Sequence, residues 1–250
     1  MQQTRIMEPS KEYRSGMQEG IARCVSQMVT HPFEQKKIQL QVHGIHSRLS
    51  LRGMFQASVA SGLISSGYFT LYNILEHHPL ASTISSMVTS LIKIPTNNSI
   101  RLFFALPATK TIIECGYKIY SVNGVKGLFT GFKVNILEDI IETNIRDHFY
   151  KVFKKSSSID NSIHTHAHNT CVGAVAGSLA AGLTTPFDCI KSNLVYYASQ
   201  TKFNPTFKKE VIKEYYLKHG FIGLYQGCLT RMSNNAIRYA LFYFILQTIL

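Results

Sequence analysis

The chain has few of the features that mark an enzyme or a metal-binding protein. No Ser-His-Asp order, phosphate-binding loop or dinucleotide-binding fingerprint is present. A cleavable signal peptide is not expected either, because residues 1–11 are polar and contain no apolar core. The cysteines have no paired spacing, so neither a disulfide framework nor a zinc site is predicted. These cysteines are Cys24, Cys115, Cys171, Cys189 and Cys228. We therefore expect no catalysis, no metal and no cofactor.

Long, uniformly apolar runs are also scarce. Although 45% of the residues are hydrophobic, the mean hydropathy is only +0.02. Residues 55–75 and 169–187 lack Asp, Glu, Lys and Arg over about the 20 residues that a spanning helix requires. Four further stretches of similar length are more polar: residues 12–33, 79–100, 132–153 and 228–250. A helix that lines a water-filled cavity tolerates such polarity, so the composition favours six helices, each with one polar side.

Acidic residues are few, 14 against 26 Lys and Arg, which gives a net charge of +12. In a six-span arrangement, the connections after the first, third and fifth spans are residues 34–52, 93–133 and 188–231. These connections hold 17 of the 26 basic residues and 5 of the 14 acidic ones, so the whole surplus falls on one side. Lys and Arg favour the side that is not translocated. A soluble nucleic-acid-binding protein is the alternative, but its charges have no reason to segregate by alternate loops.

One motif, Pro-x-acid-x-x-base, occurs three times, with a damaged second copy. The copies read PFEQKK from Pro32, PTNNSIR from Pro95 and PFDCIK from Pro186. Each copy ends a stretch of small residues and is followed by a polar segment, a glycine and a second apolar stretch. The glycines are Gly53, Gly131 and Gly227. A unit repeated three times predicts three related pairs of helices, with boundaries near residues 10–78, 79–156 and 164–250.

These residues resemble the signature of the mitochondrial carrier family, and the resemblance covers nearly the whole chain. The third copy, residues 173–191, is the most similar. The resemblance implies an all-α membrane protein of six transmembrane helices with pseudo-threefold symmetry, in one domain of residues 1–250. It further implies a monomeric, multi-pass transporter of the mitochondrial inner membrane. Such a protein moves a small solute by alternating access and binds no nucleic acid.

The resemblance also assigns roles to the motif residues. The prolines Pro32, Pro95 and Pro186 are expected to kink the odd-numbered helices at one depth. The polar residues that follow them are expected to pair between repeats and to close the matrix side of the cavity. This matrix gate comprises Glu34, Lys37, Asn97, Asp188 and Lys191.

We expect one intact ion pair in this gate. Lys191 is expected to pair with Glu34, and Lys37 to form at best a hydrogen bond with Asn97. Asp188 has Ile100 where a base is expected, so its link is lost unless the neighbouring Arg101 reaches it. The degenerate gate favours weak closure, and it also motivates the alternative of a membrane scaffold that has kept the fold without transport.

Substrate contacts in the family lie on the even-numbered helices, seven and eight residues after each glycine. The matching positions are Ala60 and Ser61, Glu138 and Asp139, and Asn234 and Asn235, with Arg238 on the same face as Asn234. Two interpretations of the acidic pair remain open. In the first, the carboxylates recognise a cationic group of the solute; in the second, they are neutralised internally, with Glu142 and Arg146 forming a helix pair.

The loops after the prolines differ in length. The first is short, whereas the second and third have room for amphipathic surface helices near residues 109–120 and 207–218. A truncated first loop resembles the S-adenosylmethionine carrier subgroup. Because an acid-rich contact suits a sulfonium or ammonium group, S-adenosylmethionine or a similar cationic metabolite is the leading solute, and a nucleotide is the second.

The glycines that precede the even-numbered helices allow two interpretations. In the family, an aromatic-base-Gly sequence at this place holds cardiolipin phosphates through free backbone N–H groups and the helix dipole. Gly53, Gly131 and Gly227 match this pattern, and Arg52 keeps the basic residue. The alternative is a plain turn before each helix.

Overall fold

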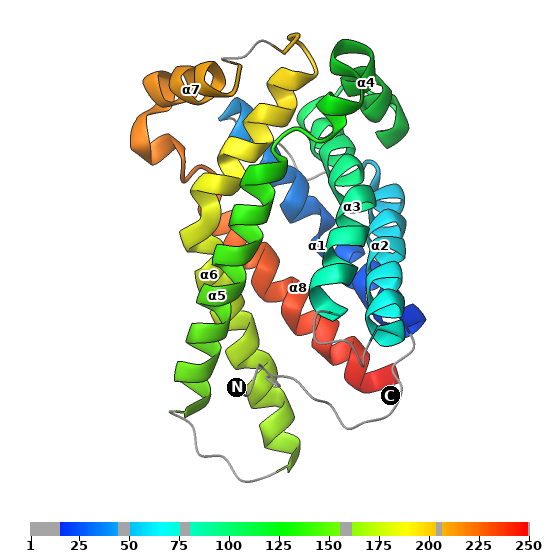
Figure 1. The fold of residues 1–250 in the computed structure, drawn as a ribbon. Helices are drawn as coiled ribbons and strands as arrows, with labels where there is room; N and C mark the ends of the chain where they lie inside the picture. Colours follow the sequence, from blue (N-terminus) through cyan, green and yellow to red (C-terminus); the bar gives the residue numbers. More distant parts are fainter. Residues whose placement is uncertain (1–15, 45–50, 76–80, 156–161, 204–206, 250) are drawn as a thin grey trace.

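The computed structural model describes residues 16–44, 51–75, 81–155, 162–203 and 207–249 (Figure 1). Within these ranges all regular secondary structure is helical, which confirms the expected all-α class. The six long helices are α1 (Gly16–His43), α2 (Met54–Ile74), α3 (Ala81–Ala105), α5 (Phe132–Lys155), α6 (Ser162–Ala198) and α8 (Cys228–Ile249). They match the six stretches that the sequence predicts as spans.

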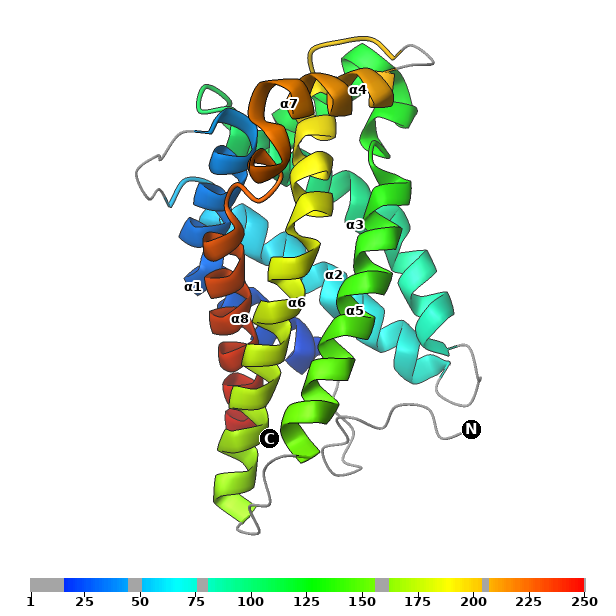
Figure 2. The same ribbon diagram turned by 90° about the vertical axis from the view of Figure 1, so that its left-hand side faces the viewer.

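The long helices are arranged side by side around a common axis (Figures 1 and 2). Helix α1 packs against α2 and α8, α2 continues to α3, and α6 packs against both α5 and α8. Helices α3 and α5, by contrast, approach each other little within the described residues. An ion pair links them, between Lys93 Nζ and Asp139 Oδ2 at 3.4 Å.

The two shorter helices confirm the predicted surface helices. Helix α4 (Ile112–Leu128) and helix α7 (Phe207–Gly223) lie at the end of the bundle opposite the C-terminus (Figure 1). Each is broken near its end by a glycine with a positive φ, Gly124 at 61° and Gly220 at 64°. Below, we call this end of the bundle the α4/α7 end.

Helix α7 is attached to α6 through Tyr215. The Tyr215 hydroxyl donates to the Gly223 carbonyl oxygen at 2.9 Å and lies 3.3 Å from Cys189 Sγ on α6. Burial raises the pKa of Tyr215 above its ordinary value, so the hydroxyl keeps its proton and remains a hydrogen-bond donor at neutral pH.

The three motif prolines lie inside helices rather than at their ends. Pro32, Pro95 and Pro186 are followed by ten or more further helical residues in α1, α3 and α6. A proline removes one intrahelical hydrogen bond, and the helix continues where the freed carbonyl has another neighbour. The Gly182 carbonyl, four residues before Pro186, faces Cys228 Sγ at 3.8 Å. A common depth and angle of bending stay a prediction.

The turns that precede α2, α5 and α8, the second, fourth and sixth long helices, have the same geometry. Gly53, Gly131 and Gly227 adopt φ values of 71°, 77° and 79°, a left-handed conformation that glycine adopts without steric cost. In all three turns the glycine carbonyl accepts from the amide four residues later, at 2.8–2.9 Å. The amide of the residue directly after the glycine donates to the carbonyl two residues before the glycine, at 3.0–3.2 Å. The local backbone is thus repeated three times, while the repeat boundaries remain a prediction.

Small residues allow α1 and α2 to approach closely. A Cβ atom added at Gly20 would lie 2.9 Å from the Gly62 carbonyl oxygen, and one added at Gly62 would lie 2.9 Å from the Gly20 carbonyl oxygen. Gly177 of α6 leaves space for the Tyr239 ring of α8 in the same way, since a Cβ atom added at Gly177 would lie 2.6 Å from a ring carbon of Tyr239. Such contacts hold helices together where hydrophobicity supplies little drive for association.

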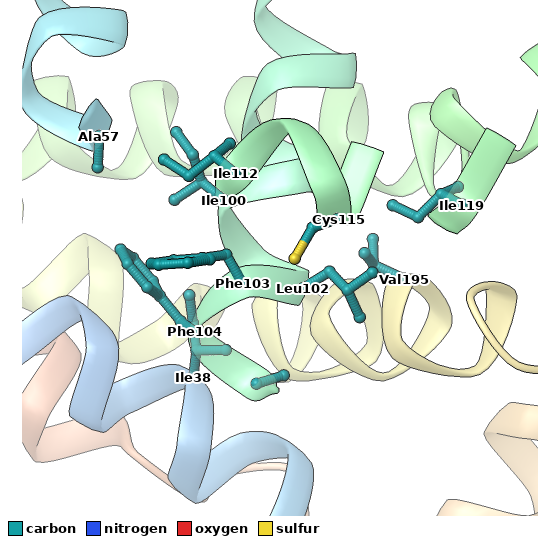
Figure 3. Packing of buried hydrophobic residues seen from close by; sticks show 11 residues of the cluster. Ile38, Ala57, Ile100, Leu102, Phe103, Phe104, Ile112, Cys115, Ile119 and Val195 are labelled. Carbon is teal, nitrogen blue, oxygen red and sulfur yellow. The ribbon is translucent and has the colours of Figure 1, made fainter. Parts of the chain in front are cut away.

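The main apolar core lies toward the α4/α7 end. It is centred on Phe103 and Phe104 near the end of α3, both fully buried, with ring centroids 6.0 Å apart. Figure 3 shows these rings beside Ile38 of α1 and below Ile100 and Ile112. Because α1, α2, α3, α4 and α6 all contribute to it, this core ties the helices together at one end.

Within the described residues, one helical segment is both long and apolar enough to cross a membrane by composition, Thr170–Ala198 of α6.

Candidate functional site

A buried cluster of charges lies where α1, α3 and α6, the first, third and fifth long helices of the bundle, come together. Its centre is Asp188 of α6, whose side chain is 2% exposed. Lys37 Nζ of α1 lies 3.1 Å from Asp188 Oδ2, and Arg101 Nη2 of α3 lies 2.6 Å from Oδ1. Lys191 Nζ and Arg231 Nε each lie 3.8 Å from this carboxylate. One acid therefore connects basic side chains from α1, α3, α6 and α8.

Two neutral side chains complete this cluster. Gln41 of α1 donates from Nε2 to Asp188 Oδ2 at 2.9 Å and accepts from the Ser192 hydroxyl at 2.8 Å. Arg101 also donates to the Ser192 hydroxyl, at 2.6 Å. Hydrogen bonds of this kind satisfy the remaining lone pairs of a buried carboxylate, which would otherwise be costly.

The expected pair of Lys191 with Glu34 is wrong. Lys191 Nζ lies instead 2.5 Å from Glu138 Oε2 and donates to Asn135 Oδ1 at 2.9 Å, both on α5. Glu34 pairs with Arg238 of α8, at 3.1 Å. The physical reason is the helix order, because α6 packs along α5 and α1 packs along α8.

Of the other two links expected in the matrix gate, the one between Lys37 and Asn97 is not formed, and the one between Asp188 and Arg101 is formed. Lys37 does not hydrogen-bond to Asn97 but pairs with Asp188, at 3.1 Å. Arg101 does reach Asp188, as the sequence allowed in place of Ile100. Three repeats therefore meet at Asp188, although the second repeat has lost its own acid.

Glu138 is neutralised internally. Its side chain is 4% exposed and lies between Lys191 and Arg231, whose Nη2 is 2.7 Å from Glu138 Oε1. The same Arg231 nitrogen lies 2.6 Å from Glu142 Oε2. The Glu142–Arg146 pair that belonged to the second interpretation is not formed, because Arg146 donates to the Tyr239 hydroxyl at 2.9 Å and Glu142 pairs with Arg231.

Asp139 lies apart from its sequence neighbour Glu138. Its side chain is 52% exposed, pairs with Lys93 at 3.4 Å and accepts from Asn135 at 3.1 Å. Successive residues point about 100° apart around a helix, so the two carboxylates face different neighbours. Glu138 belongs to the buried cluster, whereas Asp139 belongs to the seam between α5 and α3.

The remaining residues that were expected to contact the solute lie on α8 and α2 and have different neighbours. Asn235 Nδ2 lies 3.4 Å from Glu142 Oε1, so this residue joins the Arg231 cluster. Asn234 is buried, and with its amide nitrogen turned to α1 it donates to the Thr30 carbonyl at 3.0 Å. On α2, Ala60 packs against the apolar core, and Ser61 is half-buried.

Arg52 has a role at the end of α3. Its guanidinium donates to the carbonyls of Phe103 and Leu106, both at 2.7 Å, and also to that of Pro107. It also lies over the Phe103 ring, 4.2 Å from the centroid. Arg52 therefore caps α3, where unpaired carbonyls need donors.

Sequence reasoning missed the importance of Arg231. This arginine contacts Glu138, Glu142 and Asp188 and so links α8 to both α5 and α6. Its position was a usable signal, since it lies four residues after Gly227, near the start of a predicted membrane span. A basic residue at such a place in a spanning segment is expected to have an acidic partner inside the bundle.

With this geometry in view, comparison with known proteins identifies the class. The model of the mitochondrial carrier protein family matches residues 75–160 and 164–249, so the chain belongs to this family. Proteins of this family are transporters and not enzymes, and they reside in the mitochondrial inner membrane. The match covers the second and third expected repeats.

Individual relatives are distant but extend over most of the chain. The S-adenosylmethionine mitochondrial carrier protein homolog of Drosophila melanogaster is 23% identical over 85% of this chain and 83% of its own length. The mitochondrial S-adenosylmethionine carrier protein of Mus musculus is 22% identical, covering 86% and 85%. The mitoferrin of Dictyostelium discoideum is also 22% identical, covering 86% and 79%.

Proposed function

We propose that the chain is a six-span, monomeric transporter that moves a small solute by alternating access, with S-adenosylmethionine or a similar cationic metabolite as that solute. The observation that supports this most is the buried charge cluster around Asp188. It joins α1, α3, α6 and α8 near one end of the bundle. A buried ionic cluster adds little net stability compared with apolar packing, which favours a role in a two-state gate.

The membrane arrangement is supported by the way side chains are distributed. The charge clusters of α5, α6 and α8 are buried between helices, whereas many large apolar side chains are exposed. Lipid is a suitable neighbour for an exposed apolar side chain, and a poor one for a charge. Examples on four helices are Met17 (68% exposed), Leu63 (69%), Met87 (69%), Leu91 (60%) and Ile140 (55%).

The choice of solute rests on Glu138 together with the names of the relatives. Glu138 is held by two cations, Lys191 and Arg231. A sulfonium or ammonium group that reaches Glu138 can replace Lys191 as its counter-charge. Lys191 also contributes to the Asp188 cluster, so such an exchange would couple binding of the solute to the gate.

Replacing Glu138→Gln together with Asp139→Asn is expected to abolish uptake of labelled S-adenosylmethionine into liposomes that contain the purified protein. Glu138 loses the charge proposed to meet the solute, Asp139 loses its pair with Lys93, and Lys191 and Arg231 lose a buried partner. The initial rate of exchange measures the effect. Glu214→Gln on the exposed surface of α7 serves as the control. Uptake at the unaltered rate in the double variant would remove Glu138 and Asp139 from the binding site.

Lipid binding forms part of the proposal. The repeated turns at Gly53, Gly131 and Gly227 each precede a helix N-terminus, a place that favours phosphate. We assign these three turns to cardiolipin phosphates. Arg52 is excluded from this role in the present conformation, because its guanidinium donates to the carbonyls at the end of α3.

A second candidate function is a membrane scaffold that keeps the fold without transport. It is favoured by the full neutralisation of Glu138 and by the missing acid at Asn97. A nucleotide carrier is the other transport alternative. A panel of S-adenosylmethionine, nucleotides and basic amino acids separates the three, because a scaffold gives neither uptake nor thermal stabilisation with any of them.

A further inference from the structure

The last carbonyl groups of α3 and α6 accept hydrogen bonds from side chains of other helices. Gln39 of α1 donates to the Phe104 carbonyl of α3 at 3.1 Å. Asn123 of α4 donates to the carbonyl of Ala198, the last residue of α6, at 2.7 Å. The carbonyls in the last turn of a helix have no partner within that helix. Each of these side chains therefore joins two helices at the α4/α7 end.

The Asn123 amide uses both its nitrogen and its oxygen in this contact. Its Nδ2 donates to the Ala198 carbonyl and to the Thr201 carbonyl, at 2.7 and 2.9 Å. Its Oδ1 accepts from the Phe203 amide at 2.7 Å. The opposite orientation would place the amide oxygen against two carbonyl oxygens, so the neighbours fix which atom is the nitrogen. We call these three hydrogen bonds the Asn123 clasp.

The clasp joins two parts of the bundle that the proposed gate separates. Helix α4 is fixed to α3 through the main apolar core, which contains Ile112 and Cys115 of α4. Helix α3 meets α6 in the charge cluster, where Arg101 lies 2.6 Å from Asp188. When Arg101 leaves Asp188, α3 takes α4 away from α6. The clasp between α4 and the end of α6 then has to open as well.

The surroundings of the clasp suit repeated opening. Asn123 is half-buried, whereas the Asp188 side chain is only 2% exposed. Water can replace the partners of a partly exposed neutral amide, so such hydrogen bonds contribute little net free energy each. Releasing a buried charge from its partners costs more. The clasp therefore favours the closed arrangement without fixing it.

We propose that the Asn123 clasp is a latch of the α4/α7 end, made while that end is closed and exchanged for water when it opens. The proposal rests on the proposed alternating access. Asn123 acts through the charge cluster and not on the solute, because holding α4 beside α6 keeps Arg101 within reach of Asp188. It is therefore a positioning residue.

Labelling of a cysteine inside the charge cluster tests the latch in the purified full-length protein. All proteins compared carry Ser192→Cys, because Ser192 is 2% exposed and hydrogen-bonds to Gln41 of α1 and Arg101 of α3. The rate at which a water-soluble maleimide modifies position 192, read by mass spectrometry of peptides, measures how often these helices withdraw. Asn123→Ala is expected to raise this rate about tenfold, the effect of losing a few partly exposed hydrogen bonds. Asn123→Asp keeps the acceptor for Phe203 but loses both donors, and it is expected to raise the rate at least as much.

Two controls separate the latch from a general loosening of the fold. Asn144→Ala is the matched variant, since the Asn144 amide donates within its own helix, to the Ile140 carbonyl at 2.8 Å. It is expected to leave the rate at position 192 unchanged. The native Cys115 is buried, with its Sγ 3.3 Å from the Thr109 hydroxyl. Both residues move with α3 and α4, so Cys115 is expected to keep its own rate in every variant.

The outcomes judge the latch and the proposed transport separately, because the labelling needs no solute. An unchanged rate at position 192 in Asn123→Ala, or a rise that Cys115 matches, overturns the latch. Normal uptake of S-adenosylmethionine together with such a result rejects the latch alone. Faster labelling at position 192 in a protein that takes up none of the tested solutes supports the latch and rejects transport.

Discussion

Replacing Asp188→Asn is expected to abolish solute uptake and to destabilise the protein by about 3–5 kcal/mol, the usual effect of removing one partner of a buried ion pair. Asp188 is the acid shared by Lys37, Arg101, Lys191 and Arg231. Its loss leaves several cations close together with fewer counter-charges. Uptake into liposomes and the midpoint of thermal unfolding in detergent measure the two effects.

The control for this variant is the same substitution at Asp139. The Asp139 side chain is 52% exposed and its pair with Lys93 is long, at 3.4 Å. Exposed pairs of this kind contribute about 0–1 kcal/mol, so Asp139→Asn is expected to leave the unfolding midpoint nearly unchanged. Equal midpoints for the Asp188 and Asp139 variants would contradict the central place given to Asp188.

Gly53→Ala is expected to destabilise the protein by about 2–5 kcal/mol, in two separable parts. The left-handed φ of 71° costs roughly 1–2 kcal/mol for a residue with a Cβ atom. That Cβ would also collide with the Phe103 ring, and overpacking of a core typically adds about 1–3 kcal/mol. Chemical denaturation of the purified protein measures the sum.

Gly131→Ala is the matched control for Gly53→Ala. Gly131 has the same turn geometry, with a φ of 77°, but a Cβ there would meet Lys191 Cγ at 3.4 Å, an ordinary contact. This variant therefore keeps only the backbone part of the cost. If both variants lose the same stability, the contact between the Gly53 turn and the Phe103 ring contributes nothing.

The positions of the helices could be predicted because their signals are local. The stretch 55–75 became α2 (Met54–Ile74), and the surface helix near residues 207–218 became α7. The predicted spans 12–33, 79–100 and 169–187 end before α1, α3 and α6 do, because these helices continue beyond their prolines. Proline removes one hydrogen bond, and in α6 the carbonyl so freed faces Cys228. A side chain distant in sequence thus lies beside the carbonyl that the proline leaves free.

The partners inside the charge cluster could not be predicted in the same way. Helical spacing shows which residues share a face, such as Glu138 and Glu142, which both contact Arg231. It gives neither the order of helices around the bundle nor the reach of a long side chain. Lys191 therefore paired with Glu138 on the adjacent α5 instead of with Glu34.

The three glycine turns give the bundle one backbone scheme, and the helices that follow them differ in polarity. Past Gly53, α2 presents the uncharged Ala60 and Ser61; α5 contributes carboxylates, and α8 contributes guanidinium groups. The arginine of α8 neutralises the carboxylates of α5, whereas α2 brings no charge to the same depth. A scaffold with one repeated backbone turn therefore owes its asymmetry to side chains alone.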